Sequence, residues 1–139
     1  MPTVVRSSVL PFQVLVADES HYGADSLAAF LRLAGCEVAT CYDGGAVLPL
    51  AEQLHPDACV LDLRMQALGG WQVGRRLRAW AAGRPLLLVA LTWLVGRGPE
   101  DASRAAGFDY ILKPSDPRVL YEGILALIRR DQPAALQLA

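Results

Sequence analysis

The chain has 139 residues, a length typical of one domain, and 53% of them are hydrophobic while 19% are charged. This composition is too apolar for a disordered chain and is sufficient for one packed core. Thirteen basic residues against fourteen acidic ones give a net charge of -1, which argues against a nucleic-acid-binding protein, because such proteins normally carry a basic excess.

The sequence lacks the patterns of membrane and secreted proteins. Its longest apolar stretch, residues 86–95, is shorter than the ~20 residues that a membrane-spanning helix needs. The first twelve residues lack the charged start and unbroken apolar run of a secretory signal. We therefore expect a cytoplasmic protein with an extension at residues 1–12, one domain at 13–130 and a tail at 131–139.

Short apolar runs alternate along the chain with segments of helical periodicity, which is the pattern of successive βα units. The second run is amphipathic, which favours an edge strand, whereas the third is apolar on both faces and favours a central one. Gly35 is expected to end the first helix, and Pro99 is expected to delay the fourth. The predicted strands are 13–18, 37–41, 58–62, 86–91 and 110–112. The predicted helices are 21–33, a helix that follows a turn at 43–45 and runs to 54, 71–82, 99–106 and 116–130.

Alternating strands and helices predict an α/β fold, a doubly wound five-stranded parallel sheet with helices on both faces. Right-handed crossovers leave few topologies, and the flavodoxin-like order 2-1-3-4-5 is one of the two common solutions. In that order the functional crevice lies at the carboxyl ends of the first and third strands.

Polar residues follow the predicted strands at this edge. Asp18 and Glu19 follow the first, Asp62 ends the third and Thr92 follows the fourth. Each has a structural alternative, since acidic residues also begin turns and helices and threonine is common in strands. Three carboxylates gathered at adjacent strand ends would repel one another, so either their pKa values rise or a cation joins them. An all-oxygen cluster of this kind suits Mg²⁺.

Lys113 follows the fifth predicted strand and is the only lysine in a chain whose other basic residues are arginines. Its position indicates a need for a compact ammonium group, although a lysine that reaches solvent is the structural alternative. A carboxylate nucleophile beside Mg²⁺ and an ammonium group is equipped to accept a phosphoryl group.

Four segments resemble, in order and spacing, the receiver domain of two-component response regulators: VLVADES, CVLDLRMQALGGW, LVALTW and GFDYILKPSDP. The resemblance covers residues 13–130. It implies that Asp62 accepts a phosphoryl group from a histidine on a partner kinase or phosphotransfer protein. It also implies that Asp18, Glu19, Asp62 and the main-chain carbonyl of Arg64 hold Mg²⁺.

The same resemblance assigns roles to the remaining groups. It implies that Thr92 and Lys113 contact the phosphoryl oxygens, and that Tyr110 is the aromatic switch that turns inward on activation. The family usually has a cis peptide bond between the residues that match Lys113 and Pro114, and an X-Pro bond adopts cis at low cost. The family is a signalling phospho-acceptor rather than an enzyme.

The sequence departs from the family pattern at four positions. Glu19 replaces a usual aspartate, Gln66 a proline, and Gly69 a common aspartate in the same loop. Trp93 follows the threonine where a small residue is typical, so its ring is expected to shield the phosphoryl site or to block small phosphodonors. The glycine-rich segment after Trp93 predicts an atypical partner surface.

Several residues are expected to have structural roles. The three cysteines have no metal-binding or disulfide spacing and are predicted to be buried free thiols. Trp71 and Trp80 are expected to pack against the core, and His21 to be exposed at a helix start. The basic run of Arg75, Arg76 and Arg78 is predicted to form a solvated face.

Two other functions remain open from the sequence. One is a pseudo-receiver, which keeps the fold but only binds proteins and is not phosphorylated. The other is a phosphatase of the haloacid-dehalogenase kind, which needs a second acid where Arg64 stands. The sequence leaves the downstream target or output domain open, and a homodimer is possible; neither nucleic acid nor a membrane is expected as a direct partner.

Overall fold

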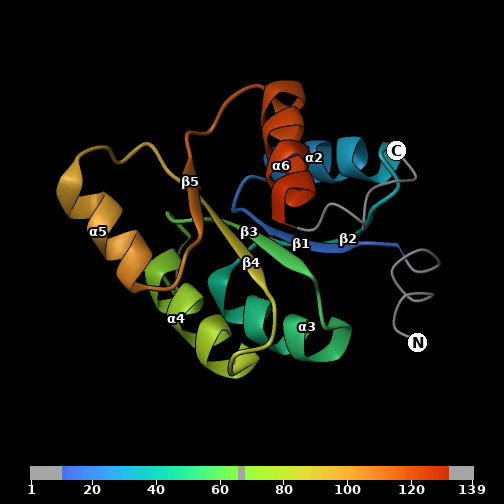
Figure 1. The fold of residues 1–139 in the computed structure, drawn as a ribbon. Helices are drawn as coiled ribbons and strands as arrows, with labels where there is room; N and C mark the ends of the chain where they lie inside the picture. Colours follow the sequence, from blue (N-terminus) through green and yellow to red (C-terminus); the bar gives the residue numbers. More distant parts are fainter. Residues whose placement is uncertain (1–10, 66–67, 132–139) are drawn as a thin grey trace.

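The computed structural model describes residues 11–65 and 68–131. Five parallel strands form one sheet in the order β2-β1-β3-β4-β5, as predicted (Figure 1). The amphipathic second strand is at an edge, and the fully apolar third strand is central. The strands are β1 (Gln13–Ala17), β2 (Glu37–Cys41), β3 (Ala58–Asp62), β4 (Leu87–Leu91) and β5 (Tyr110–Leu112).

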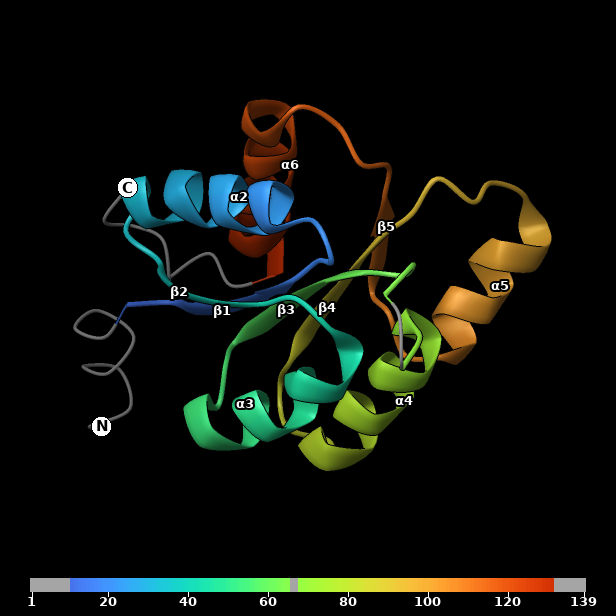
Figure 2. The same cartoon turned by 180° about the vertical axis from the view of Figure 1, so that it is seen from behind.

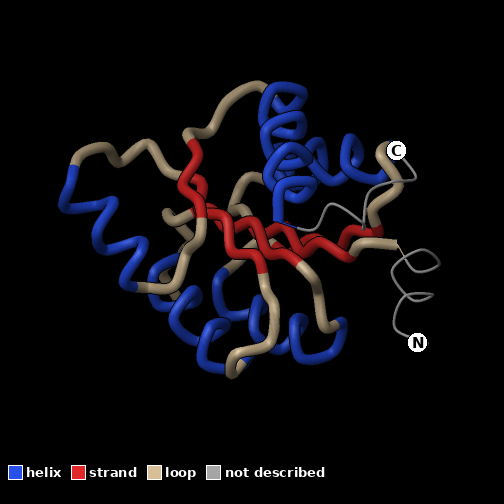
Figure 3. The backbone as a smooth tube through the Cα atoms, in the orientation of Figure 1, coloured by secondary structure: helices blue, strands red, loops and turns tan. Residues whose placement is uncertain are grey.

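Helices cover both faces of the sheet (Figures 1 and 3). On one face α2 (His21–Leu33) packs with α6 (Pro117–Asp131) over alternate residues of β1, β3 and β4. On the other, α3 (Val47–Leu54) and α4 (Gly70–Ala81) cover the intervening residues. Figure 2 shows α5 (Arg97–Ala105) beyond α4, near β5. The fold is thus doubly wound, with two apolar layers.

The ends of α2 follow well-known capping chemistry. The hydroxyl of Ser20 accepts the Gly23 N–H at 3.0 Å, which satisfies one of the unpaired donors of the first turn. At the other end Gly35 adopts a positive φ of 99°, and the N–H groups of Gly35 and Cys36 bond the carbonyls of Arg32 and Leu31. Gly35 therefore ends this helix as the sequence predicts.

The segment after Asp43 turns before α3 starts, as predicted. It forms a short 3-10 turn, η1 (Gly44–Ala46), and the Asp43 carboxylate accepts the Ala46 N–H at 3.0 Å.

One helix starts differently from the prediction. The expectation that α5 forms only after Pro99 is wrong, because α5 begins at Arg97. Proline is tolerated there because the N–H groups of a first helical turn have no partner within the helix.

Arg78 does not belong to a solvated face. Arg75 and Arg76 are exposed as predicted, but the half-buried Arg78 guanidinium bonds the carbonyls of Gly107 and Leu86 and the carboxylate of Asp109, the last at 2.9 Å. It thereby ties α4 to the segments before β4 and β5. Sequence periodicity could not reveal this role, because the carbonyls that Arg78 satisfies come from distant loops.

The expectations for the cysteines and for the two tryptophans of α4 are confirmed. The thiols of Cys36, Cys41 and Cys59 are free and buried, and burial raises the pKa of the first two to about 11 and that of Cys59 further. Trp71 and Trp80 are half-buried. Within the described ranges, no helix combines the length and the apolar character that crossing a membrane requires.

A glycine allows the loop after Asp62 to pack closely on α4. A Cβ atom on Gly70 would lie 2.6 Å from the Leu63 Cα, whereas one on Gly69 would meet nothing within 4 Å. Leu63 directly follows the strand that carries Asp62, so the first turn of α4 fixes the backbone at the strand's end.

Gly70→Ala is therefore expected to reduce the free energy of unfolding by about 1–3 kcal/mol, because the Leu63 backbone must move. Gly69→Ala is the matched control and should cost less than about 1 kcal/mol. Urea denaturation of both variants measures this. Equal stability of the two would show that the close approach does not constrain the loop.

Candidate functional site

Asp18 and Asp62 lie side by side at the ends of the neighbouring strands β1 and β3. In the register of β1 and β3, Val16 lies opposite Val60 and Ala17 opposite Leu61, so Asp18 comes beside Asp62. Strand alternation directs both carboxylates to the face that Val16 and Val60 also occupy. Two residues 44 positions apart in the sequence therefore meet where their strands end.

Backbone hydrogen bonds orient both carboxylates. Asp18 Oδ1 accepts the Ser20 N–H at 2.9 Å, and Asp62 Oδ1 accepts the Arg64 N–H at 3.0 Å. The N-cap of α2 is Ser20, so Asp18 supports the helix start without being its cap. Each carboxylate is held by the turn that follows its strand and remains directed toward the other.

The pair is electrostatically strained. Burial, together with the neighbouring Asp62 and Glu19 carboxylates, raises the pKa of the Asp18 carboxyl from 3.8 to about 6, although the hydrogen bond from the Ser20 N–H lowers it. Two half-buried carboxylates at one strand edge make an arrangement that a bound cation would relieve. The observed donor set therefore fits a hard divalent cation.

Asp18 and Asp62 line a crevice of about 250 Å³ at this edge. Its walls come from the start of α2, the turn after β3, the loop after β4 and the segment between β5 and α6. Tyr22, Arg64, Trp93 and Pro114 are among the lining residues. Four separate segments thus converge at the two carboxylates, as expected for the carboxyl edge of a doubly wound sheet.

A cation here would depend on few side chains. Across residues 11–65 and 68–131, no group of three or more His, Cys, Asp or Glu side chains is arranged to hold a metal ion. Asp18 and Asp62 are the two carboxylates placed together, and Glu19 is half-buried beside them. Mg²⁺ commonly keeps several waters and uses only one or two carboxylates, so this sparse set remains suitable.

Thr92 lies at the end of β4, and its side chain is almost completely buried, with 3% exposure. Its N–H donates to the Leu112 carbonyl at 3.0 Å, and its Oγ1 accepts the Leu94 N–H at 3.0 Å. The hydroxyl therefore fixes the loop after β4 through its oxygen and retains its own proton for another acceptor.

Lys113 does not meet the carboxylates in this structure. Its side chain is exposed, and Arg78–Asp109 is the only ion pair within 4.0 Å among the residues that the structure describes. The implied contact of Lys113 with the phosphoryl oxygens stays a prediction. A long, strongly hydrated side chain is not positioned by its place at a strand end alone.

The expected cis bond between Lys113 and Pro114 is wrong, because no peptide bond among the described residues is cis. The two isomers of an X-Pro bond differ by only about 0.5–1 kcal/mol, so the sequence does not decide between them. The trans bond leads into Pro114 and Ser115, which line the crevice.

Tyr110 is half-buried and packs toward α6. Its hydroxyl donates to Asp131 Oδ1 at 2.9 Å, and this hydrogen bond raises the pKa of the Tyr110 hydroxyl. The ring also contributes to the apolar layer under α2 and α6. The structure therefore records one position of this side chain, anchored at the end of α6.

Three site residues were not predicted. Ser20 caps α2 and lines the crevice, Tyr22 lines it with a 75% exposed side chain, and a Cβ on Gly23 would lie 3.1 Å from Asp18 Oδ2. A serine three residues before Gly23 was the available signal for the cap.

His21 is exposed as expected and stacks on Tyr42 at 3.6 Å between ring centroids. Gly69 is exposed, and Gln66 lies outside the described residues.

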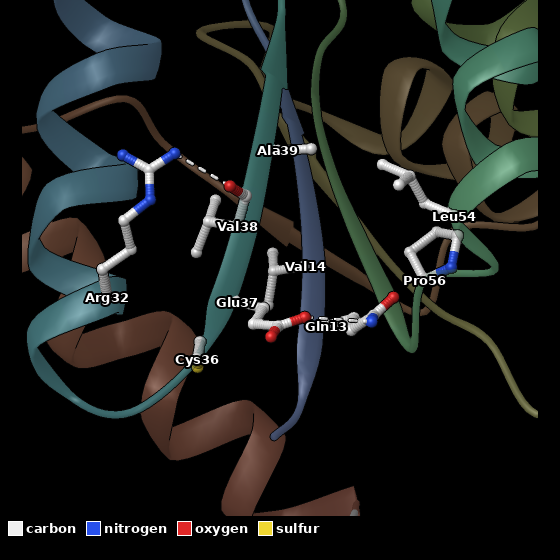
Figure 4. A pocket seen from close by; sticks show the side chains of 9 residues that line it. All are labelled: Gln13, Val14, Arg32, Cys36, Glu37, Val38, Ala39, Leu54 and Pro56. Carbon is white, nitrogen blue, oxygen red and sulfur yellow. Dashed lines mark hydrogen bonds between the residues drawn. The ribbon is translucent and has the colours of Figure 1, made fainter. Parts of the chain in front are cut away.

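A larger cavity lies elsewhere and carries no comparable chemistry. It measures about 390 Å³ and lies at the amino ends of β1 and β2, as Figure 4 shows. Arg32 donates to the Val38 carbonyl at 2.8 Å, and the Gln13 amide donates to Glu37 at 3.1 Å. Its polar groups bond one another, so we identify the smaller crevice as the candidate site.

Comparisons with known proteins match most of the chain. The family profile described as the response regulator receiver domain matches residues 14–125. The transcriptional regulatory protein PrrA of Mycobacterium tuberculosis is 37% identical over 85% of this chain, and the DNA-binding response regulator MtrA of Mycolicibacterium smegmatis is 33% identical over 89%. The chain spans about half the length of these relatives, 50% and 54% respectively.

The solved structures that resemble this one share its fold. The chemotaxis response regulator CheY4 of Vibrio cholerae superposes with a TM-score of 0.77 at 23% identity, covering 85% of this chain and 99% of its own. A CheY-like receiver domain protein of Methanospirillum hungatei gives 0.78 at 20% identity, covering 89% and 98%.

The raised pKa of Asp18 predicts a pH dependence of stability. Because the folded state holds this proton more tightly than the unfolded chain, the free energy of unfolding in metal-free buffer should fall as pH rises from 3.8 to about 6. Asp18→Asn should remove this fall and stabilise the protein at neutral pH by about 1 kcal/mol, after allowance for solvent screening. Urea titrations across this pH range test it, and parallel profiles for both proteins would contradict the strained pair.

Proposed function

The chain belongs to the response regulator receiver domain family of two-component systems, and on that basis we propose that it accepts a phosphoryl group on Asp62 in a Mg²⁺-dependent reaction. The family is a signalling phospho-acceptor and not a classical enzyme. The proposed donor is a phosphohistidine of a sensor kinase or phosphotransfer protein. The modified chain would then change conformation and signal to a partner.

One observation carries this proposal: Asp18 and Asp62 adjoin at the ends of neighbouring strands, and the pKa of Asp18 is raised to about 6 by burial and by Asp62. Two adjacent carboxylates without a role would only lower the stability of the fold, and uncharged residues at these positions would not do so. A site that binds a cation and a phosphoryl group would require this pair.

The proposed reaction uses Asp62 as the nucleophile. A carboxylate oxygen attacks phosphorus, the P–N bond of the donor breaks, and a P–O bond to Asp62 forms. The Arg64 N–H, which already donates to Asp62 Oδ1 at 3.0 Å, keeps the carboxylate oriented during the attack.

Bound Mg²⁺ would offset negative charge on the carboxylates and on the phosphoryl oxygens. We assign its ligands to Asp18, Asp62 and the main-chain carbonyl of Arg64. Glu19 directly follows Asp18 and would influence the position of the metal through its longer side chain. The turn after β3 places Arg64 on the wall of the crevice, which supports the last protein ligand.

Two further groups would act once Asp62 is modified. Thr92 retains a hydroxyl proton that it would donate to a phosphoryl oxygen, and Lys113 would turn its flexible, exposed side chain inward as a counter-charge. Tyr110 would follow by leaving its hydrogen bond with Asp131, which carries the change toward α6. The Tyr110 role and the inward turn of Lys113 both require motion from the described positions.

A pseudo-receiver is the second candidate, and two observations favour it. The Lys113 ammonium is not paired with either carboxylate in the described structure, and Trp93 lies on the rim of the crevice. In this alternative the fold only binds a partner protein. Either function is compatible with an attached output domain, with a separate protein target and with a homodimer.

Phosphorylation of Asp62 is the direct test. With beryllofluoride or acetyl phosphate and Mg²⁺, the wild-type chain should change its intrinsic tryptophan fluorescence, because Trp93 lines the same crevice. Asp62→Asn should abolish the response, since it removes the nucleophile. If the wild type also fails to respond to a phosphorylated histidine kinase, the pseudo-receiver alternative is correct.

Trp93 should limit access to the site. Trp93→Ala is expected to increase the rate of modification by acetyl phosphate several-fold, because it removes a large ring from the crevice wall. Val95→Ala, which also shortens an exposed apolar side chain of this loop, is the matched control and should leave the rate unchanged. Equal rates in Trp93→Ala and wild type would show that the ring is not a barrier.

A further inference from the structure

Three consecutive large apolar side chains are exposed in the loop after β4. Trp93, Leu94 and Val95 are 58%, 48% and 62% exposed. Isolated exposed apolar residues are ordinary, but a contiguous group of this size usually marks an interaction site.

A cavity of about 270 Å³ adjoins this loop, separate from the crevice that contains Asp62. Leu63, Trp71 and Leu94 give it apolar walls, and Arg75 adds a cation. The Trp71 indole N–H donates to the buried Ser103 hydroxyl at 2.9 Å, which fixes the ring against α5. The cavity is thus preformed and large enough for one or two apolar side chains of a partner.

Positive charge is concentrated in the part of the sequence that supplies the walls of this cavity. Residues 63–99 contain six arginines and no acid, whereas residues 11–62 contain eight acids and one arginine. Arg78 and Arg84 bond backbone carbonyls of the chain itself. The other four, which are exposed and have no ion pair or side-chain hydrogen bond with a described residue, are Arg64, Arg75, Arg76 and Arg97.

We propose that this basic apolar surface, formed by Leu63, Trp71, Arg75, Arg76 and Leu94, docks a protein segment that carries acidic side chains around an apolar anchor. The anchor would enter the cavity, and carboxylates of the partner would pair with Arg75 and Arg76, whose guanidinium groups suit bidentate contacts. Glu100 and Asp101 on α5 are the acids that follow the basic stretch, and they would orient the partner by repulsion.

Protein fits this surface better than nucleic acid. Binding to a phosphate backbone relies on many cationic contacts, and the acidic half of this molecule would repel a polyanion. The apolar cavity requires an inserted side chain, which an amphipathic acidic segment supplies.

The surface also adjoins the phospho-acceptor crevice. Leu63 follows Asp62 directly, and the Leu94 N–H is bonded to Thr92 Oγ1 at 3.0 Å. A movement of the Thr92 side chain would therefore reach the cavity wall. Docking to the unmodified chain does not require phosphorylation, so this proposal and the proposed function can fail separately.

The test selects a library of random short peptides on the unmodified chain and measures the affinity of the enriched sequences. We expect enriched peptides to combine several Asp or Glu residues with a Leu, Phe or Trp. Their affinity should fall at least about tenfold on Arg75→Glu/Arg76→Glu and on Leu94→Asp. Arg129→Glu/Arg130→Glu, an adjacent exposed pair on α6, is the matched control and should change affinity less than about twofold.

Several outcomes would overturn the proposal: no enriched peptide, enriched peptides that are neutral or basic, or affinities that Arg75→Glu/Arg76→Glu leaves unchanged. Tighter binding of single-stranded oligodeoxythymidine, lost in the same variant, would identify a nucleic acid as the occupant instead. Self-association lost in that variant would identify a second copy. Circular dichroism confirms that each variant is folded before binding is measured.

Discussion

The closeness of two carboxylates is the constraint on which this site depends. Asp18 and Asp62 extend the register of β1 and β3 on one face of the sheet, so the parallel ladder itself brings their charges together. Burial and mutual repulsion oppose ionisation of Asp18, whose pKa is raised to about 6. The fold thus holds two carboxylates that repel one another at a fixed edge of the sheet. A bound cation would offset this repulsion and take both carboxylates as ligands.

Other features of the edge keep this pair accessible and oriented. Backbone N–H groups of the following turns hold one oxygen of each carboxylate, and the close packing at Gly70 fixes the turn after Asp62. Thr92, which directly follows β4 at the same edge of the sheet, accepts a hydrogen bond from the loop that bears the exposed apolar residues. A change at Asp62 that moved Thr92 would reach the basic apolar surface. Phosphoryl transfer and partner binding would then use different residues that lie close together in the structure.

Features with strong local signals were predictable from sequence. Apolar runs and capping residues gave α2, β2 and the sheet order, and strand ends located Asp18 and Asp62. Features set by long-range contacts were not. Arg78 turns inward because distant carbonyls need donors, α5 starts before Pro99 because a first turn tolerates proline, and the exposed Lys113 has no packing to position it. The basic apolar surface also escaped prediction, since its cavity forms only when α4 and the loop after β4 meet.

Mg²⁺ affinity, measured by isothermal titration calorimetry for the wild type, Asp18→Asn and Asp62→Asn, tests the shared carboxylate site most directly. A site shared by Asp18 and Asp62 predicts one binding event in the wild type and a loss of at least about tenfold in affinity for each variant, because each variant removes one of the two carboxylate ligands of the same ion. Affinity that is unchanged in either variant, or absent in the wild type at neutral pH, would contradict it.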